Sequence, residues 1–197
     1  MMTTQADLPL FPLHTVLVPG AALGIRVFEP RYLDLVREVG RSGGGFGVCM
    51  IVEGSEAGAA ATPAAWGTEA LIEDFDQGPD GVLALQVRGA RRFQVQRTRV
   101  RDNGLVMADI DWVVEDESPR LRPEHALLGE LLVRILEQTD ADLNAIAKPR
   151  LQEAAWIGWR LAELLPLVNE QRQGLLQERD PHARLQWILD FVSESEP

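Results

Sequence analysis

Two short stretches decide the fold: LPLFPL at residues 8–13 and VFEPRY at residues 27–32. The first is apolar and contains Pro9 and Pro12, which predicts an edge or bulged strand because proline cannot donate a ladder hydrogen bond. In the second, Pro30 suits the first turn of a helix, and apolar residues then recur on one helical face. We therefore expect a strand followed by the first helix.

The residues beside Pro30 also have local structural roles. Phe28 is expected to pack as a hydrophobic staple at the start of the helix, and Glu29 to pair with Arg31. We interpret this segment as a fold signature and not as an active site. An exposed strand edge near Pro9 and Pro12 would also have a binding function, because such an edge can accept an extended segment of another polypeptide.

The apolar pattern changes near Ser118. Before it, apolar runs predict strands at residues 46–52, 67–75, 82–87, 92–100 and 105–113. After it, helical periodicity and cap signals predict helices at residues 127–136, 151–165, 169–177 and 181–192. The expected fold is α+β with segregated elements, divided into a β-rich subdomain at residues 1–117 and a helical subdomain at residues 118–197.

Composition excludes several classes of function. The 197 residues include 19 Lys and Arg against 30 Asp and Glu, and the net charge of −11 opposes binding to phosphate backbones and anionic membranes. No apolar run approaches the roughly 18 residues of a membrane-spanning helix. The start of the chain lacks the pattern of a signal peptide, and Cys49 is the only cysteine. We expect a soluble, cytoplasmic protein without a membrane partner.

Several segments, in this order, resemble the N-terminal substrate-binding domain of Lon protease. They are LPLFPL and VFEPRY, followed by FGV at 46–48, WGT at 66–68 and GARRFQV at 89–95. The resemblance implies a PUA-like β-barrel with one inserted helix, followed by a C-terminal helical bundle. It also implies that the chain binds polypeptide segments or a protein partner, in the setting of protein quality control.

The catalytic modules of a complete Lon protease can be tested for directly. Its ATPase needs G-x-x-x-x-G-K-[ST], and its peptidase needs a lysine to activate a serine. Lys148 is the only lysine among the 19 basic residues, and Pro149 follows it, so it fits neither motif. We therefore expect a non-catalytic recognition module and not an enzyme.

Other catalytic or metal-binding arrangements are weak. His14, His125 and His182 lie far apart and lack the spacing of zinc ligands. Cys49 lies within an apolar run and is interpreted as a small buried hydrophobe, not a nucleophile. We predict no metal and no cofactor.

An arginine-rich strand favours a different function. Six arginines fall within 14 residues of this acidic chain, at positions 88, 91, 92, 97, 99 and 101. A two-residue loop at Asn103-Gly104 would place Arg101, Arg99 and Arg97 opposite apolar residues, unless the strand projects beyond the core or a bulge switches its faces. The arginine stems could cover apolar neighbours, the heads could bind a peptide or acid, or the strand could bind RNA. The RNA alternative is weakened by the net charge and by the absence of interleaved aromatic residues.

Trp156 and Trp159 lie three residues apart on a wide apolar arc of a predicted helix. They belong either to the helical core or to a partly open apolar groove for unfolded segments. Our candidate partner-binding residues are therefore Arg97, Arg99, Arg101, Pro12, His14, Trp156 and Trp159.

Overall fold

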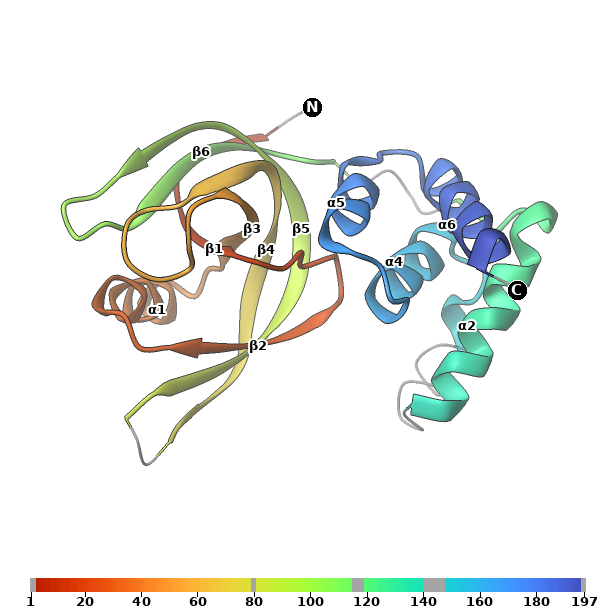
Figure 1. The fold of residues 1–197 in the computed structure, drawn as a ribbon, viewed down its shortest axis with the longest axis horizontal. Helices are drawn as coiled ribbons and strands as arrows, with labels where there is room; N and C mark the ends of the chain where they lie inside the picture. The colour runs from red at the N-terminus through yellow and green to blue at the C-terminus, as the bar shows by residue number, and fades with distance from the viewer. Residues whose placement is uncertain (1–2, 79–80, 115–118, 140–147, 196–197) are drawn as a thin grey trace. The chain divides into compact units, whose positions relative to one another are not determined.

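The computed structural model describes residues 3–78, 81–114, 119–139 and 148–195. The chain divides into two compact units, Met1–Val114 and Glu115–Pro197. The first unit contains a six-stranded sheet and one helix, and the second contains helices, so the predicted α+β class is confirmed (Figure 1). The predicted boundary between residues 117 and 118 lies outside the described residues. The PUA-like label and the bundle arrangement stay predictions.

The sheet of the first unit closes on itself. Its strands are β1 (Thr3–Leu13), β2 (Ala22–Val27), β3 (Phe46–Glu53), β4 (Thr62–Gln77), β5 (Leu83–Val100) and β6 (Val106–Trp112). They are ordered β2-β5-β4-β3-β1-β6, and a further pairing of β5 with β6 closes the ring. Only β2 stands outside this ring of five strands. The end of β4 and the start of β5 extend away from the ring as a long hairpin (Figure 1).

The first strand does not lie at an edge. It pairs antiparallel with β6 and, from Leu10 onward, parallel with β3. The expectation of an edge strand at Pro9 and Pro12 is therefore wrong. The expected irregularity is present, because the register with β6 shifts between Gln5 and Leu8. The strand pairs with β6 up to Pro9 and with β3 from Leu10 to Leu13, so each proline lies in a segment that is paired with one neighbour.

The core of the first unit is built around Phe93 of β5, which is fully buried. A Cβ atom at Gly47 or at Gly67 would lie 2.6 Å from the Cζ atom of Phe93. The two glycines leave the space that the ring fills, which explains two of the quoted motifs, FGV and WGT. The edge of the Phe93 ring meets Trp112 of β6, with the ring centroids 6.0 Å apart.

The helix α1 (Pro30–Ser42) begins at the predicted proline. Tyr32 stacks on Phe11 of β1 with the ring centroids 3.9 Å apart, which holds the helix against the sheet. The predicted ion pair is confirmed, with 3.1 Å between Arg31 and Glu29. The predicted staple is wrong. Phe28 is 62% exposed, because Val27 takes the buried position at the end of β2.

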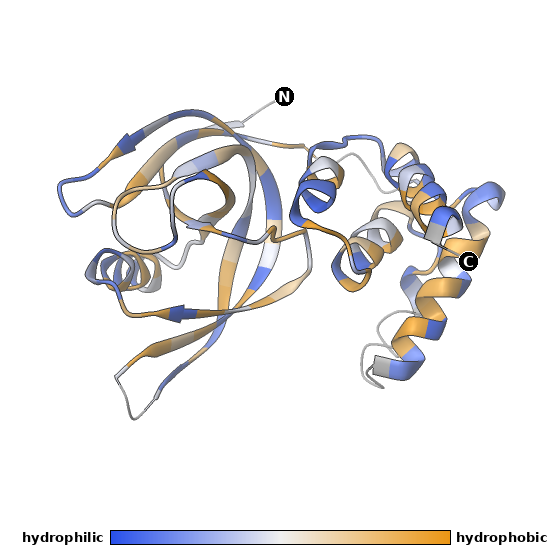
Figure 2. Cartoon of the chain, in the orientation of Figure 1, coloured by the Kyte–Doolittle hydropathy of each residue, from blue (hydrophilic) through white to orange (hydrophobic). Residues whose placement is uncertain are grey.

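The second unit contains α2 (Ala126–Thr139), α4 (Ala154–Leu164), α5 (Asn169–Gln177) and α6 (Pro181–Ser195), with short 3-10 turns η1 (Pro123–His125) and η2 (Lys148–Arg150). Orange and blue segments alternate along α2 in Figure 2, as expected of an amphipathic helix. The start of α6 is as predicted, because the Asp180 carboxylate accepts a hydrogen bond from the His182 backbone N at 2.9 Å. Aliphatic side chains from α2, α4 and α6 form much of the core of the second unit. The buried residues are Leu128, Leu132, Leu136, Ile157, Leu161, Leu185 and Ile188.

Two arginines tie the helices of this unit together. Arg184 is fully buried, with its guanidinium 3.4 Å from the centroid of the Trp159 ring and Nη2 donating to the Glu178 carbonyl at 2.6 Å. Arg172 Nε donates to the Ala162 carbonyl at 2.9 Å. Both cations meet carbonyl groups near the ends of the preceding helices, where the helix dipole favours positive charge.

We predict that Gly67→Ala destabilises the first unit by about 1–3 kcal/mol, because the added methyl group overpacks the core. Its Cβ would lie 2.5 Å from Cys49 Sγ and 2.6 Å from the Val48 carbonyl oxygen. Gly40→Ala is the control, since nothing lies within 4 Å of that Cβ, and it should raise stability by up to about 1 kcal/mol in a helix. Urea unfolding followed by circular dichroism measures both effects. Equal midpoints for the two variants would contradict the packing account.

We also predict that the second unit loses stability in mild acid. His182 is buried and stacks on His125 with 5.6 Å between ring centroids. Burial lowers the pKa of His182 below its ordinary 6.5, and Arg122 lowers it further, whereas Asp180 opposes the shift. Below pH 6.5 the unfolded chain therefore binds a proton that the folded unit resists, so stability falls as pH falls toward the folded-state pKa.

The measurement is the thermal midpoint of wild type and His182→Gln between about pH 7.5 and 5. The variant should show a flatter pH profile. The matched control is His14→Gln, which removes an exposed histidine from the other unit and should keep the wild-type slope. An unchanged slope in His182→Gln would refute the assignment.

Candidate functional site

The three arginines that were candidate binding residues on β5 all pair with carboxylates of the same unit. Arg97 lies 2.8 Å from Asp109 of β6, and Arg101 lies 2.7 Å from Glu38 of α1. Arg99 pairs with Asp7, the residue at the bulge of β1. These contacts join β5 to β6, α1 and β1.

The other arginines of the cluster are also engaged. Arg88 pairs with Glu73, with 3.0 Å between Nη2 and Oε2, and Arg91 lies 2.9 Å from Glu69. Arg92 is buried, with its guanidinium 6.0 Å from the centroid of the Trp66 ring. The positive charge is therefore neutralised within the unit, and RNA binding by this strand is not favoured.

The register of the arginine strand differs from the two-residue hairpin that we predicted. Val100 pairs with Val106, so the loop holds five residues, and Gly104 adopts a positive φ of 83° within it. Arg97 lies opposite Asp109, not Ile110, and Arg99 lies opposite Met107. The register shifts between Val95 and Arg97, so a bulge is present, and residues 96–100 are exposed on both faces, as expected of a strand that projects beyond the core.

The remaining candidate residues do not form one site. Pro12 is buried, and His14 is exposed with its backbone N donating to Glu56 Oε1 at 2.6 Å. Trp159 is only 6% exposed, so it belongs to the helical core and lines no open groove. Trp156 is half-buried, with the Arg150 guanidinium 5.4 Å from its ring centroid.

An apolar groove that we did not predict lies between α1 and the β4–β5 hairpin. Its cavity volume is about 640 Å³, within the range of ligand-binding clefts. Phe75 is 70% exposed and Leu71 is 41% exposed at this groove. The lining residues are Val36, Val39, Gly40, Gly43, Gly44, Leu71, Ile72, Glu73, Phe75, Leu83 and Leu85. We call this feature the α1 groove.

The sequence contains one signal for the α1 groove. Phe75 stands between Asp74 and Asp76 in a strand segment that is otherwise acidic, so an aromatic ring is placed where a polar residue is expected. The groove itself was not predictable, because its other wall is the last turn of α1, some 30 residues away along the chain. Gly40, Gly43 and Gly44 leave that wall without large side chains.

The single cysteine of the chain, Cys49, lies in the first unit. Cys49 is buried, and burial raises the pKa of its thiol far above the ordinary value, so the thiol is protonated and unreactive. Across the described ranges, no group of three His, Cys, Asp or Glu residues is placed to hold a metal ion. In the same ranges, no helix has both the length and the apolar character needed to cross a membrane.

Comparison with known proteins identifies the class of this fold. The crystal structure of a Lon N-terminal domain protein from Xanthomonas campestris superposes with a TM-score of 0.81 at 56% identity, and the match covers 94% of this chain and 98% of that chain. The N-terminal domain of the Mycobacterium avium complex Lon protease has a TM-score of 0.70 at 20% identity over 96% and 100% of the two chains, which shows a shared fold. The class is thus the Lon-type N-terminal domain.

The family follows from the sequence itself. Residues 7–194 match the family model of the ATP-dependent protease La (LON) substrate-binding domain. The chain therefore belongs to the LON substrate-binding domain family. A search of curated proteins returns no match.

We predict that the chain does not bind single-stranded RNA in fluorescence anisotropy at about 50 mM salt, because the arginines of β5 are already paired with carboxylates. Salt-sensitive binding that disappears in the Arg97→Ala/Arg99→Ala double variant would contradict this. Arg37→Ala/Arg41→Ala is the matched control, since it removes the same charge from α1. Loss of binding in both double variants would indicate a non-specific charge effect.

Proposed function

We propose that this chain is a non-catalytic module that binds unfolded or extended polypeptide segments in the α1 groove. The observation that carries the proposal is the exposure of Phe75 and Leu71 beside an apolar cavity of about 640 Å³. Support also comes from the family, whose description is a substrate-binding domain. We place this activity in cytoplasmic protein quality control, because a single, unpaired cysteine is typical of a protein in a reducing compartment.

The groove suits apolar side chains of varied sequence. Burial of an exposed apolar side chain such as Phe75 contributes about 1.5–3 kcal/mol of binding free energy, whatever the sequence of the apolar partner. Among the lining residues only Glu73 is charged, and its carboxylate already pairs with Arg88. A groove with few polar groups imposes little sequence specificity, as a receptor for unfolded chains requires.

Recognition without hydrolysis fits the residues that are present. The only lysine, Lys148, matches neither an ATPase loop nor a serine–lysine peptidase. The thiol of Cys49 is buried and protonated. We therefore propose no catalytic residue and no cofactor. RNA binding is not proposed as a second function, because the arginines of β5 have partners within their own unit.

The α1 groove is tested by replacing its exposed aromatic residue. We expect Phe75→Ser to weaken binding of a fluorescein-labelled, carboxymethylated unfolded lactalbumin by about tenfold, because burial of one large apolar side chain is lost. Val52→Ser is the matched control. Val52 is 65% exposed and lies outside the groove, so this variant should bind as wild type does.

Fluorescence anisotropy titration of the three proteins measures the effect. Both substitutions change exposed residues, so a difference between them reports binding and not folding. Equal affinity of Phe75→Ser and Val52→Ser would move the binding site away from the α1 groove. An absence of binding by the wild-type protein would refute polypeptide binding altogether.

A further inference from the structure

The strand β2 lies at the end of the described sheet. Among the described strands it pairs only with β5, and it ends the strand order of the sheet. The Gly89 backbone N donates to the Ala21 carbonyl at 2.9 Å, so the odd-numbered residues of this antiparallel pair make the hydrogen bonds to β5. The peptide groups of Gly24 therefore point away from β5. Gly24 is exposed, and such an edge is a template for a further strand.

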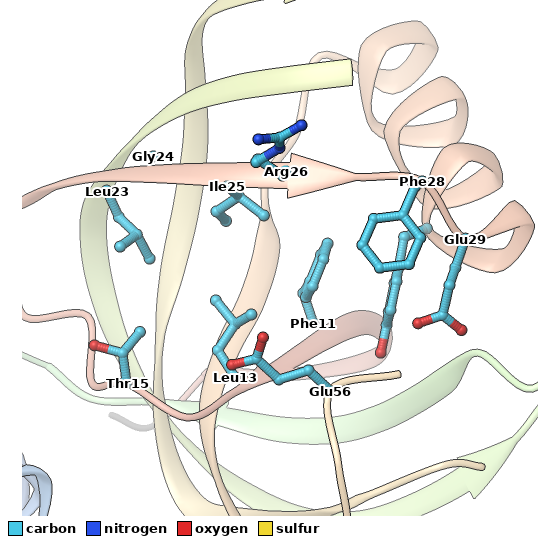
Figure 3. A pocket seen from close by; sticks show the side chains of 11 residues that line it. Phe11, Leu13, Thr15, Leu23, Gly24, Ile25, Arg26, Phe28, Glu29 and Glu56 are labelled. Atoms are coloured by element: carbon cyan, nitrogen blue, oxygen red, sulfur yellow. The ribbon is translucent and has the colours of Figure 1, made fainter. Parts of the chain in front are cut away.

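A pocket of about 270 Å³ lies along this edge (Figure 3). Its volume is slightly below the range of about 300–1,000 Å³ for sites that enclose small molecules, which suits a single inserted side chain. Figure 3 shows Leu23 and Ile25 on the β2 side, and Leu13 across from them. Phe28 stands at the rim, 62% exposed. We call this feature the β2 pocket.

The polar residues that line the β2 pocket include two carboxylates, together with Thr15, Arg26 and Tyr32. Glu29 and Glu56 both line it, and in Figure 3 the Arg26 side chain extends to the opposite side of β2 from Ile25. Arg31 lies 3.1 Å from Glu29 and is nearly buried, so one positive charge faces two negative charges. The local excess of negative charge favours a cation.

Tyr32 adds a neutral hydroxyl group to the same pocket. Burial raises the pKa of Tyr32, and nearby Glu29 and Glu56 raise it further against the lowering effect of Arg31. The phenol therefore stays protonated at neutral pH and can hydrogen-bond to an occupant, whereas its ring is already stacked on Phe11 and covered by the Arg31 guanidinium, 4.6 Å from the ring centroid. Glu29 is already paired with Arg31, but an apolar occupant would desolvate the Glu56 carboxylate without supplying an opposite charge, which is unfavourable.

We propose that β2 pairs with an extended polypeptide segment whose lysine or arginine side chain enters the β2 pocket. The aliphatic stem of that side chain contacts Leu13 and Ile25, and its charged end reaches Glu56 and Glu29. This inference rests on the proposed polypeptide-binding function and specifies the substrate: an extended segment with a basic residue among apolar ones. The α1 groove and the β2 pocket are lined by different residues, so the two can be tested separately.

The test uses the full chain and three labelled nine-residue peptides of alternating valine and threonine. The first carries a central lysine, and the second replaces it by norleucine. The third keeps the lysine but is N-methylated at the two residues that flank it and at every second residue beyond them. We expect the lysine peptide to bind about tenfold more tightly than the norleucine peptide, as a charge-assisted hydrogen bond provides. N-methylation should weaken binding by at least about tenfold, because it removes strand-pairing donors.

A protein variant locates the contact. Glu56→Gln keeps an oxygen to accept the hydrogen bond from His14 N, so the loop is preserved while the charge is lost. This variant should lose most of the preference for lysine over norleucine. Glu53→Gln is the matched control, since Glu53 is exposed nearby and does not line the β2 pocket. It should keep the wild-type preference.

Each outcome decides one claim. Equal binding of the lysine and norleucine peptides, or equal behaviour of Glu56→Gln and Glu53→Gln, overturns the cation pocket. Unchanged binding of the N-methylated peptide overturns strand pairing at β2. If none of the peptides binds to a chain that still binds unfolded lactalbumin, this inference fails while the proposed function stands. If unfolded lactalbumin does not bind either, the proposed function fails.

Discussion

The strand-rich unit depends on the pairing of β5 along both of its sides. Over residues 83–88 β5 joins β2 and β4, its pairing with β4 continues to Gln94, and from Phe93 onward it joins β6, which closes the ring. The buried ring of Phe93 makes this closure possible because Gly47 and Gly67 leave room for it. Strand pairing and core packing therefore meet at one residue, and α1 is held against the sheet that results.

Arginine fastens both units. On β5 the guanidinium groups join neighbouring elements through carboxylates, and in the helical unit Arg172 and Arg184 bind backbone carbonyls near helix ends. A planar guanidinium with five donors suits such contacts better than the single ammonium of lysine. Several of the 18 arginines among the 19 basic residues make such contacts. Because the arginines of β5 are paired with carboxylates, the arginine-rich strand does not indicate nucleic-acid binding here. Recognition is then expected at apolar and acidic surfaces.

Much of the fold follows from local signals. Pro30 starts α1, Asp180 and Pro181 start α6, and the apolar run from Phe46 forms β3, because caps and periodicity act within a few residues. The predicted register of β5 with β6 was wrong by one residue near the loop and by two residues beyond the bulge near Arg97, since the loop length and the bulge depend on the partner strand. Neither the α1 groove nor the β2 pocket could be predicted. Each is lined by elements that only the closed sheet brings together.

By itself, the sequence determined the α+β class, the family resemblance and the absence of ATPase and serine–lysine motifs, because these depend on residue identity and short-range spacing. The tertiary structure decided which charges are satisfied and which edges stay open. Arg97 and Arg99 form ion pairs with Asp109 and Asp7, which are distant in sequence, and so are not available to a ligand. The end strand of the described sheet is β2, not the proline-containing β1, because strand order is set by long-range hydrogen bonds that no local pattern encodes.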